Sequence, residues 1–295
     1  MTERPLSPRL RAERVRLDGV ESRVERRFPG LIAEVEGRLR ALVEAVDVND
    51  LSRHNAGYRR YGVDAFRHLV VQERARFLHH LEVIAETPGA RTVCDLGTFI
   101  PYLPLALALS GYQVRIVEKF EYYGASFIRV LSRLAADTGM ELHDLDILRD
   151  PFDAIPPADV ALLTAVVEHL NGSPRELLRK IRPLLAPGGQ LLFEVPNIVE
   201  FTKRLHVLLG GSPLMDYRDY IDSAYPYMGH NREMTVPEVA FLLEASGYHV
   251  DRLECYDYAP GGERSLKGHL AQALKAMLPV PNKGEAIFAT ARPGA

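Results

Sequence analysis

The chain has 295 residues, of which 47% are hydrophobic and 25% are charged, and its formal net charge is −3. This composition is ordinary for a globular protein with one large domain, or one domain and a small appendage. The near-neutral charge argues against a general binder of nucleic acids or membrane surfaces, and no apolar run reaches the roughly 18 residues of a membrane span. Two cysteines, Cys94 and Cys255, are interpreted as free thiols in a reducing cytoplasm.

The N-terminal region divides into an arm and a helical segment. Residues 1–30 are rich in arginine and glutamate and are expected to form a mobile arm. Residues 31–88 contain apolar residues at helical spacing and are expected to form an N-terminal helical lid. Within it, residues 52–62 are polar, aromatic and cationic, so they are either a surface loop or a lid whose Tyr58 and Tyr61 reach over a bound ligand.

Residues 92–120 predict a strand, a tight turn, a helix and a second strand. The turn contains Asp95, Gly97 and Thr98, and Glu118 lies at the tip of the second strand. Ligands of an open parallel sheet bind beyond the carboxyl ends of its strands, where ionised carboxylates accept strong hydrogen bonds from hydroxyl groups such as those of a ribose. The alternative is a common glycine turn with a solvated acid beside it.

Alternating strands and helices continue after this stretch. A short third strand leads to Asp146 and Ile147, a pair that suits an adenine through its carboxylate and apolar side chain, or else forms a plain acidic turn. Two further strands, 159–163 and 190–195, flank a helix with a capping-box pattern that begins at Ser173. This alternation predicts a doubly wound, mostly parallel α/β sheet.

The alternation of strands and helices stops at residues 197–232, which form an aromatic-rich insertion after a strand. Its position suits a substrate-binding cap in which Tyr227 and Arg232 contact the acceptor, with a surface salt bridge as the alternative for Arg232. Two last strands, 248–256 and 285–291, have no full crossover between them and predict an antiparallel end to the sheet.

Over residues 66–292, the sequence resembles class I S-adenosylmethionine-dependent methyltransferases. The most specific part is the VVEHL stretch (166–170), which is followed by a helix start and a Pro-Gly-Gly turn. The chain is similar to the small-molecule O-methyltransferase subgroup that includes the ubiquinone-biosynthesis type. The motifs that carry the resemblance are VCDLG (93–97), Glu118, Asp146-Ile147, DVALLTAVVEHL (159–170), LLAPGGQLLFEVPN (184–197) and GHNREMTVPEVAFLLEASGY (229–248).

The resemblance implies a Rossmann-like methyltransferase fold for residues 89–295, with a seven-stranded sheet, one antiparallel strand, N-terminal helices and the cap insertion. It also implies S-adenosylmethionine as the cofactor. The expected cofactor-binding residues are Asp95, Gly97 and Thr98 at the methionine end, Glu118 at the ribose, Asp146 and Ile147 at the adenine, and Thr164 and Ala165 on the other side.

One departure from the family pattern lies in the glycine loop. The family has small residues two and four places after the first glycine, whereas this chain has Phe99 and Pro101. Phenylalanine resists positive backbone angles and proline lacks an N–H donor. The loop is therefore expected to follow a different path or to hold the methionine end differently.

A hydroxyl acceptor benefits from a general base, which is most often histidine. His169 is the first candidate because it follows the fourth strand, and His230, at the end of the insertion, is the second. The alternative for both is a structural hydrogen bond in a loop. The other histidines have no spacing that predicts a metal site.

The sequence thus predicts methyl transfer to a small-molecule acceptor, most favourably at a hydroxyl oxygen, in a biosynthetic pathway of the secondary-metabolite type. N- or C-methylation and a non-catalytic methyltransferase-like binding protein stay open. A nicotinamide dehydrogenase is disfavoured because its three-glycine fingerprint is absent. Nucleic-acid and membrane partners are not expected, and the N-terminal helices are candidates to pair across a homodimer.

Overall fold

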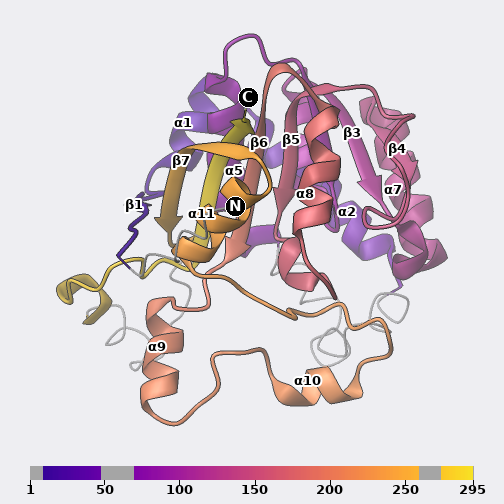
Figure 1. Cartoon of the computed structure of the whole chain (residues 1–295). Helices are drawn as coiled ribbons and strands as arrows, with labels where there is room; N and C mark the ends of the chain where they lie inside the picture. The colour runs from indigo at the N-terminus through magenta and orange to yellow at the C-terminus, as the bar shows by residue number, and fades with distance from the viewer. Residues whose placement is uncertain (1–8, 48–69, 259–273, 295) are drawn as a thin grey trace.

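A central sheet of eight strands organises the computed structural model, which describes residues 9–47, 70–258 and 274–294 (Figure 1). The strand order is β1-β7-β8-β6-β5-β2-β3-β4. In chain order the strands are β1 (Glu13–Arg14), β2 (Thr92–Leu96), β3 (Gln113–Glu118), β4 (Glu141–Asp144), β5 (Ala158–Thr164), β6 (Leu185–Pro196), β7 (Tyr248–Tyr256) and β8 (Ala286–Pro293).

Strands β6, β5, β2, β3 and β4 are mutually parallel, and β8 is antiparallel to both β6 and β7. The chain first runs outward from β2 to β4 and then returns to place β5 on the other side of β2. The point of reversal, between β2 and β5, is where ligands bind in sheets of this kind. The predicted doubly wound, mostly parallel sheet with an antiparallel end is confirmed.

Helices cover both faces of the sheet. One face carries α1 (Val20–Arg27), α2 (Leu31–Ala45), α5 (Arg74–Glu86), α6 (Tyr102–Leu109) and α7 (Gly124–Thr138). The other face carries α8 (Arg175–Ile181) and α11 (Val236–Ala245). None of the helices in the described parts of the chain combines the length and apolar character needed to cross a membrane.

The described part of the N-terminal region contains a strand and two helices. In residues 9–30, which the sequence analysis assigns to a mobile arm, β1 pairs with β7 and α1 packs against α5 and α2. Val20 and Val24 supply the apolar stripe of α1 and are almost completely buried. With β1 included, the sheet has eight strands instead of the seven expected.

The two predicted capping boxes have different outcomes. Thr235 and Glu238 form one at the start of α11, where each side chain accepts from the other residue's backbone N–H. At the start of α8, no side-chain cap forms, and the Ser173 hydroxyl only accepts from Arg175 N at 3.4 Å. The prediction of a capping box at Ser173 was therefore wrong.

A buried polar network lies between α5 and strands β6 and β7. The carboxylate of Glu194 accepts from Tyr256 Oη at 2.7 Å, lies 2.8 Å from His80 Nε2, and pairs with the guanidinium of Arg76. Burial alone would raise the pKa of Glu194, but the charges of Arg76 and His80 hold that pKa at about 2. The network therefore holds α5 against the middle of the sheet, and Arg76 and Glu194 form an ionised pair within it.

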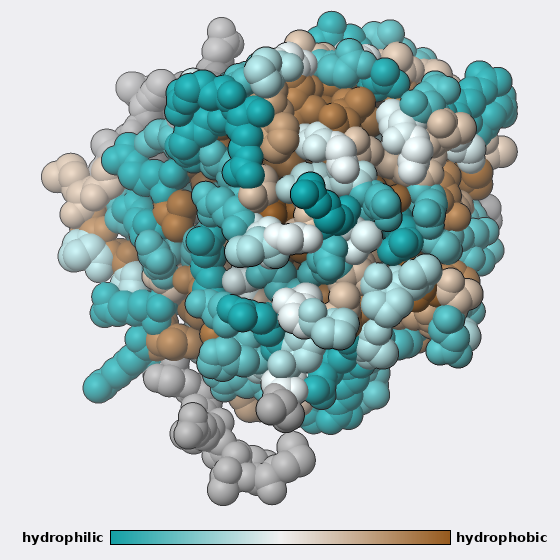
Figure 2. Space-filling model, turned by 90° about the horizontal axis from the view of Figure 1, so that it is seen from above, coloured by the Kyte–Doolittle hydropathy of each residue, from teal (hydrophilic) through white to brown (hydrophobic). Residues whose placement is uncertain are grey.

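The insertion extends away from the sheet as α9 (Phe201–Leu208) and α10 (Tyr217–Asp222), at the bottom of Figure 1. Its apolar side chains are unusually exposed, with Leu208 at 81% and Leu209 at 85%. Figure 2 shows the opposite end of the molecule, where hydrophilic side chains cover most of the surface. The insertion thus carries apolar side chains that are available for contact.

Candidate functional site

The first part of the site is the turn after β2. The buried carboxylate of Asp95 accepts from Thr98 Oγ1 at 2.5 Å, and burial raises its pKa to about 6. Gly97 has φ +81°, and a Cβ built on it would lie 2.7 Å from Val166 Cγ2. Position 97 therefore requires glycine both for its backbone conformation and for the close approach of the loop after β5.

The second part is Glu118 at the end of β3. Its carboxyl group is buried, and it accepts from Lys119 N at 2.6 Å and from Tyr123 Oη at 3.1 Å. Burial raises the pKa of Glu118 to about 8, although both hydrogen bonds act in the opposite direction. Each carboxylate oxygen can accept more than one hydrogen bond, so acceptor capacity remains for hydroxyl groups of a ligand.

The unusual loop residues have clear structural roles. The Phe99 ring stacks on Tyr123, with centroids 5.3 Å apart, and on Phe127 at 6.1 Å. Phe99 avoids a positive φ, which among non-glycine residues of the described chain occurs only at Ala165 and Asn282. Pro101 is the N-cap residue of α6, where a missing N–H costs little. The expectation of a different loop path is consistent with this aromatic stack, which orients Tyr123 toward Glu118.

Asp146 and Ile147 lie beyond β4 on the same edge of the sheet. Asp146 Oδ1 accepts from Leu148 N at 2.8 Å and from Arg149 N at 3.2 Å, which is an Asx-type turn. Ile147 is half-buried and packs against the core on the α8 face. The Asp146 carboxylate therefore stabilises an acidic turn, which was the alternative interpretation of this pair. Contact of Asp146 and Ile147 with an adenine stays a proposal.

The third part is the loop after β5. Thr164 is the last residue of the strand, and Ala165 takes φ +54° while its N–H donates to Glu194 O at 2.9 Å. Val166 then contacts the Gly97 turn, and a short 3₁₀ helix, Val167–His169, follows. Glu168 and His169 thus follow two and three residues after Val166, which contacts the turn after β2.

Glu168, His169 and His230 form a group that we call the Glu168 cluster. Glu168 Oε1 lies 3.9 Å from His169 Nε2 and 4.0 Å from His230 Nε2. The two imidazole rings meet edge to face, with centroids 4.9 Å apart. The structure thus brings together both histidines that the sequence analysis selected, and adds an acid that it did not select.

Burial sets the protonation of the cluster. Glu168 is fully buried, neither of its carboxylate oxygens has a hydrogen-bond partner among the described residues, and burial raises its pKa to about 7. Burial also lowers the pKa of His169, to about 4. At neutral pH His169 is therefore an uncharged imidazole.

The outer side of the cluster is fixed by the end of the insertion. Asn231 N donates to Glu168 O at 2.6 Å, and Asn231 Nδ2 donates to His169 O at 2.8 Å. His230 Nδ1 lies 2.8 Å from Glu233 Oε1, and Lys203 also pairs with Glu233. These bonds hold the loop after β5 and the loop before α11 together, and the bond from Asn231 to His169 spans 62 residues.

The residues expected to contact the acceptor lie in different places. Tyr227 packs on Gly229 beside His230 and meets Tyr220 edge to face at 5.0 Å. Arg232 is largely exposed and pairs with Glu238 at 2.7 Å, which is the salt-bridge alternative for this residue. Tyr58 and Tyr61 lie outside the described residues.

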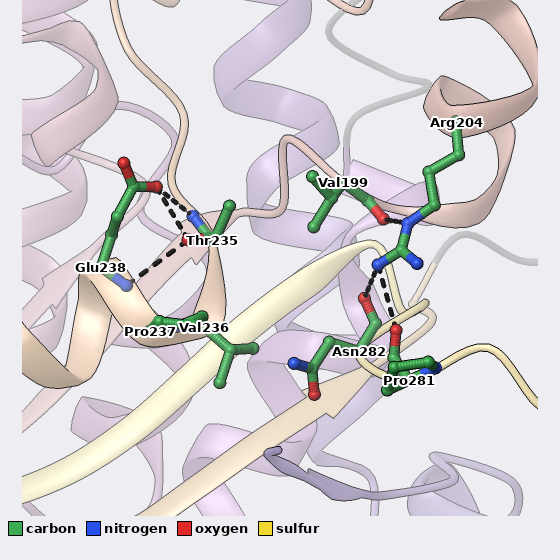
Figure 3. A pocket seen from close by; sticks show the side chains of 8 residues that line it. All are labelled: Val199, Arg204, Thr235, Val236, Pro237, Glu238, Pro281 and Asn282. Carbon is green, nitrogen blue, oxygen red and sulfur yellow. Dashed lines mark hydrogen bonds between the residues drawn. The ribbon is translucent and has the colours of Figure 1, made fainter. Parts of the chain in front are cut away.

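A pocket lies next to the Arg232–Glu238 pair, where the starts of α9 and α11 approach Pro281 and Asn282 (Figure 3). Arg204 lines the pocket, and its guanidinium donates to the backbone carbonyls of Val199, Pro281 and Asn282. Glu238 also lines the pocket, and its carboxylate belongs to the capping box of α11. The polar groups of this pocket are thus used to fix the chain, and we assign it no ligand.

Comparison with known proteins agrees with this geometry. A family model described as a methyltransferase domain matches residues 58–253. No curated protein sequence matches the chain. The structure is similar to the methyltransferase in a complex with the Trm112 methyltransferase activator of Haloferax volcanii, with a TM-score of 0.53 and 14% identity over 80% of this chain and 96% of that one.

Two further solved structures share the fold. The pyocyanin biosynthetic protein PhzM has a TM-score of 0.50 and 18% identity over 81% of this chain. The CcbJ methyltransferase from Streptomyces caelestis has a TM-score of 0.50 and 14% identity over 76% of this chain and 89% of that one. The chain spans 61% of the length of PhzM. Identities this low establish a shared fold only.

Proposed function

The chain belongs to the methyltransferase-domain family, and from that premise we propose that it transfers the methyl group of S-adenosylmethionine to a hydroxyl oxygen of a small molecule. In that reaction the acceptor oxygen bonds to the methyl carbon while the carbon–sulfur bond breaks and the sulfur keeps the electron pair. The protein has to align the reacting atoms and accommodate the hydroxyl proton. Its residues are suited to both tasks.

For the cofactor we propose Glu118 at the ribose, Asp95, Gly97 and Thr98 at the methionine end, and the four residues Asp146, Ile147, Thr164 and Ala165 around the rest. The support is the pair of buried carboxyl groups at the ends of β2 and β3, next to the point where the strand order reverses. Buried acceptors aimed at that edge match a ligand rich in hydroxyl groups.

The support for the acceptor side is the Glu168 cluster, two members of which follow closely after Val166, the residue that contacts Gly97 in the turn after β2. A hydroxyl bound there would meet neutral imidazole nitrogen and a carboxyl group in a largely buried setting. His169 and His230 are therefore retained as the residues that activate the acceptor, now together with Glu168. Tyr227, which packs beside His230, is proposed to contact the acceptor body.

The exposed apolar side chains of α9 and α10 support an acceptor with an apolar part, because they lie in the insertion whose end carries His230. We propose a role in a biosynthetic pathway of the secondary-metabolite type, and a cytoplasmic location. The two buried free cysteines suit a reducing compartment.

Calorimetric titration of the full chain with S-adenosylmethionine, and separately with S-adenosylhomocysteine, tests the cofactor. We expect micromolar binding that Glu118→Ala removes, whereas Glu141→Ala, which changes an exposed acid on the neighbouring strand, leaves binding intact. Hydroxylated small molecules are then screened by mass spectrometry for the gain of one methyl group. Absence of binding by both cofactor forms would contradict the proposal.

A further inference from the structure

We propose that Glu168, His169 and His230 bind a divalent transition-metal cation, with one carboxylate and two imidazoles as ligands and the remaining coordination positions open to an oxygen of the acceptor. The inference deepens the proposed function, on which its catalytic meaning rests. The cation site itself depends only on the geometry of the three side chains.

The spacing of the ligand atoms suits a cation. One ligand atom from each of the three residues lies within 4.8 Å of the other two, and the two imidazole Nε2 atoms are 3.9 and 4.0 Å from Glu168 Oε1. Atoms at these spacings surround a point about 2.5 Å from each of them, and metal bonds to nitrogen and oxygen are about 2.0 to 2.2 Å for zinc. Small side-chain rotations therefore suffice to close the site.

A second observation comes from Glu168 alone. Its side chain has 0% exposure, and neither carboxylate oxygen has a hydrogen-bond partner among the described residues. A buried carboxylate without hydrogen bonds is costly, and the two histidines at 3.9 and 4.0 Å are too distant to supply them. A cation between Glu168 and the histidines supplies the missing partner.

The surroundings orient the ligands. His230 Nδ1 bonds to Glu233 Oε1 at 2.8 Å, which leaves Nε2 directed to the cluster. Lys203 pairs with Glu233 and fixes that carboxylate in turn. A carboxylate bonded to the outer nitrogen of a metal-binding histidine is the usual support of such a ligand, because it sets the tautomer and the ring orientation.

The donor set indicates the class of cation. Two imidazoles and one carboxylate suit zinc, iron, cobalt and manganese, whereas magnesium and calcium prefer sites made of oxygen atoms alone. Three protein ligands also leave open positions, as catalytic sites require. The site therefore fits a first-row divalent metal that also contacts a substrate.

The cation changes the role of the histidines from base to ligand. A hydroxyl bound to a divalent cation has a lowered pKa, so its proton passes to a solvent water and the oxygen becomes the anionic nucleophile. The oxygen–carbon bond then forms as the carbon–sulfur bond breaks, and the electron pair of that bond stays on sulfur. The hydroxyl proton leaves to water and the methyl group takes its place on oxygen, so the reaction needs no further reactant.

The test uses the full chain after treatment with a chelator, titrated with Co²⁺ and followed by visible absorption and calorimetry. We expect one Co²⁺ per chain, seen as a change in the d–d absorption bands of the ion and as heat of binding, and displacement of Co²⁺ by Zn²⁺. Glu168→Gln and His230→Ala should weaken binding on the order of 100-fold or more, and Glu233→Gln by about 10- to 100-fold. His249→Ala, at a histidine that is 79% exposed, is the matched control and should leave binding unchanged.

Circular dichroism and S-adenosylhomocysteine titration of each variant show whether it is folded. Failure of the wild-type chain to bind Co²⁺, or undiminished binding by Glu168→Gln and His230→Ala, would overturn the cation site and leave a structural ion pair. If Co²⁺ binds but neither cofactor form does, the proposed function fails and the cation site stands. If the cofactor binds but Co²⁺ does not, the cation site is wrong and the proposed cofactor binding stands.

Discussion

The side chain of Val166 occupies the space that a side chain at position 97 would need, since a Cβ on Gly97 would lie 2.7 Å from Val166 Cγ2. Gly97 belongs to the turn after β2, which faces the proposed cofactor. Val166 belongs to the loop after β5, which carries Glu168 and His169. The contact therefore sets the position of one half of the proposed active site relative to the other.

Gly97→Ala tests this contact. The substitution adds a side chain at φ +81° and an overlap with Val166, so we expect a loss of about 2–4 kcal/mol in the free energy of unfolding and weaker cofactor binding. Gly89→Ala is the matched control, because Gly89 has φ +76° but nothing within 4 Å of its Cβ position. The free energy of unfolding of Gly89→Ala should fall only by the cost of a positive φ at alanine, about 1 kcal/mol.

Urea denaturation and calorimetric titration measure both effects. Val166→Ala in the Gly97→Ala background should recover part of the loss, because it removes the overlapping methyl groups. Equal losses for Gly97→Ala and Gly89→Ala would show that the contact with Val166 has no energetic weight.

The raised pKa of Glu118 predicts proton release on cofactor binding. At pH 7 a carboxyl group with a pKa of about 8 is mostly protonated, and the ribose hydroxyls and positive sulfonium of S-adenosylmethionine favour its ionised form. We expect on the order of one proton released per cofactor bound at pH 7. Titration in buffers of different ionisation enthalpy measures this number, and Glu118→Gln should reduce it to near zero. Identical heats in all buffers would exclude the prediction.

The same group makes a prediction for the free protein. The pKa of Glu118 is raised from 4.5 to about 8, so the folded state holds this proton more tightly than the unfolded state does. Its contribution to the free energy of unfolding is full below pH 4.5 and is lost as the pH rises to 8. We expect the wild-type chain to lose more stability than Glu118→Gln between pH 5 and 8. Parallel stability curves would refute the assignment.

Tyr123→Phe removes the hydroxyl that donates to Glu118 at 3.1 Å. That hydrogen bond lowers the pKa of Glu118, so its loss should move the pKa further up and weaken cofactor binding at pH 7 by about 3- to 10-fold. The weakening should diminish at higher pH, where the carboxyl group is ionised in both proteins. Tyr112→Phe, which removes a phenol oxygen far from Glu118, should have no effect on the pH profile.

The buried pair of Arg76 and Glu194 should be important for stability. Glu194→Gln leaves a buried guanidinium without its main partner, and we expect a loss of about 3–5 kcal/mol in chemical denaturation. Glu141→Gln is the control because Glu141 is 60% exposed and pairs with Arg115, a contact expected to contribute less than about 1 kcal/mol. A small loss for Glu194→Gln would show that the network tolerates a neutral acceptor.

Much of the fold could be predicted because the strong signals are local. Apolar runs bounded by glycine and proline mark β2, β5 and β6, and their alternation with helices leaves few arrangements other than a doubly wound sheet. The packing of α1 could not be predicted in this way. Only Val20 and Val24 mark its buried side within a charged segment, and their burial depends on contact with α5, which is distant in sequence.

The candidate site was predictable in part for the same reason. Asp95, Gly97 and Glu118 follow strands directly, so their shared edge follows from the topology. The approach of His230 to Glu168 depends on the bond from the Asn231 backbone N–H to the carbonyl of Glu168, which lies far earlier in the chain, and no spacing in the sequence encodes that contact. The sequence offered no signal for the burial of Glu168, because acidic side chains are almost never fully buried unless they are paired.

The two-residue strand β1 has a consequence for how the molecule behaves in a crowded solution. An edge strand presents unpaired backbone groups that can recruit the edge of another molecule. Glu13 and Arg14 cover β7 beside Glu254 and Cys255, while the opposite edge, β4, is short and carries the charges of Glu141 and Asp144. The sheet thus discourages edge-to-edge aggregation at both ends, and a chain shortened past Arg14 would lose that protection along β7.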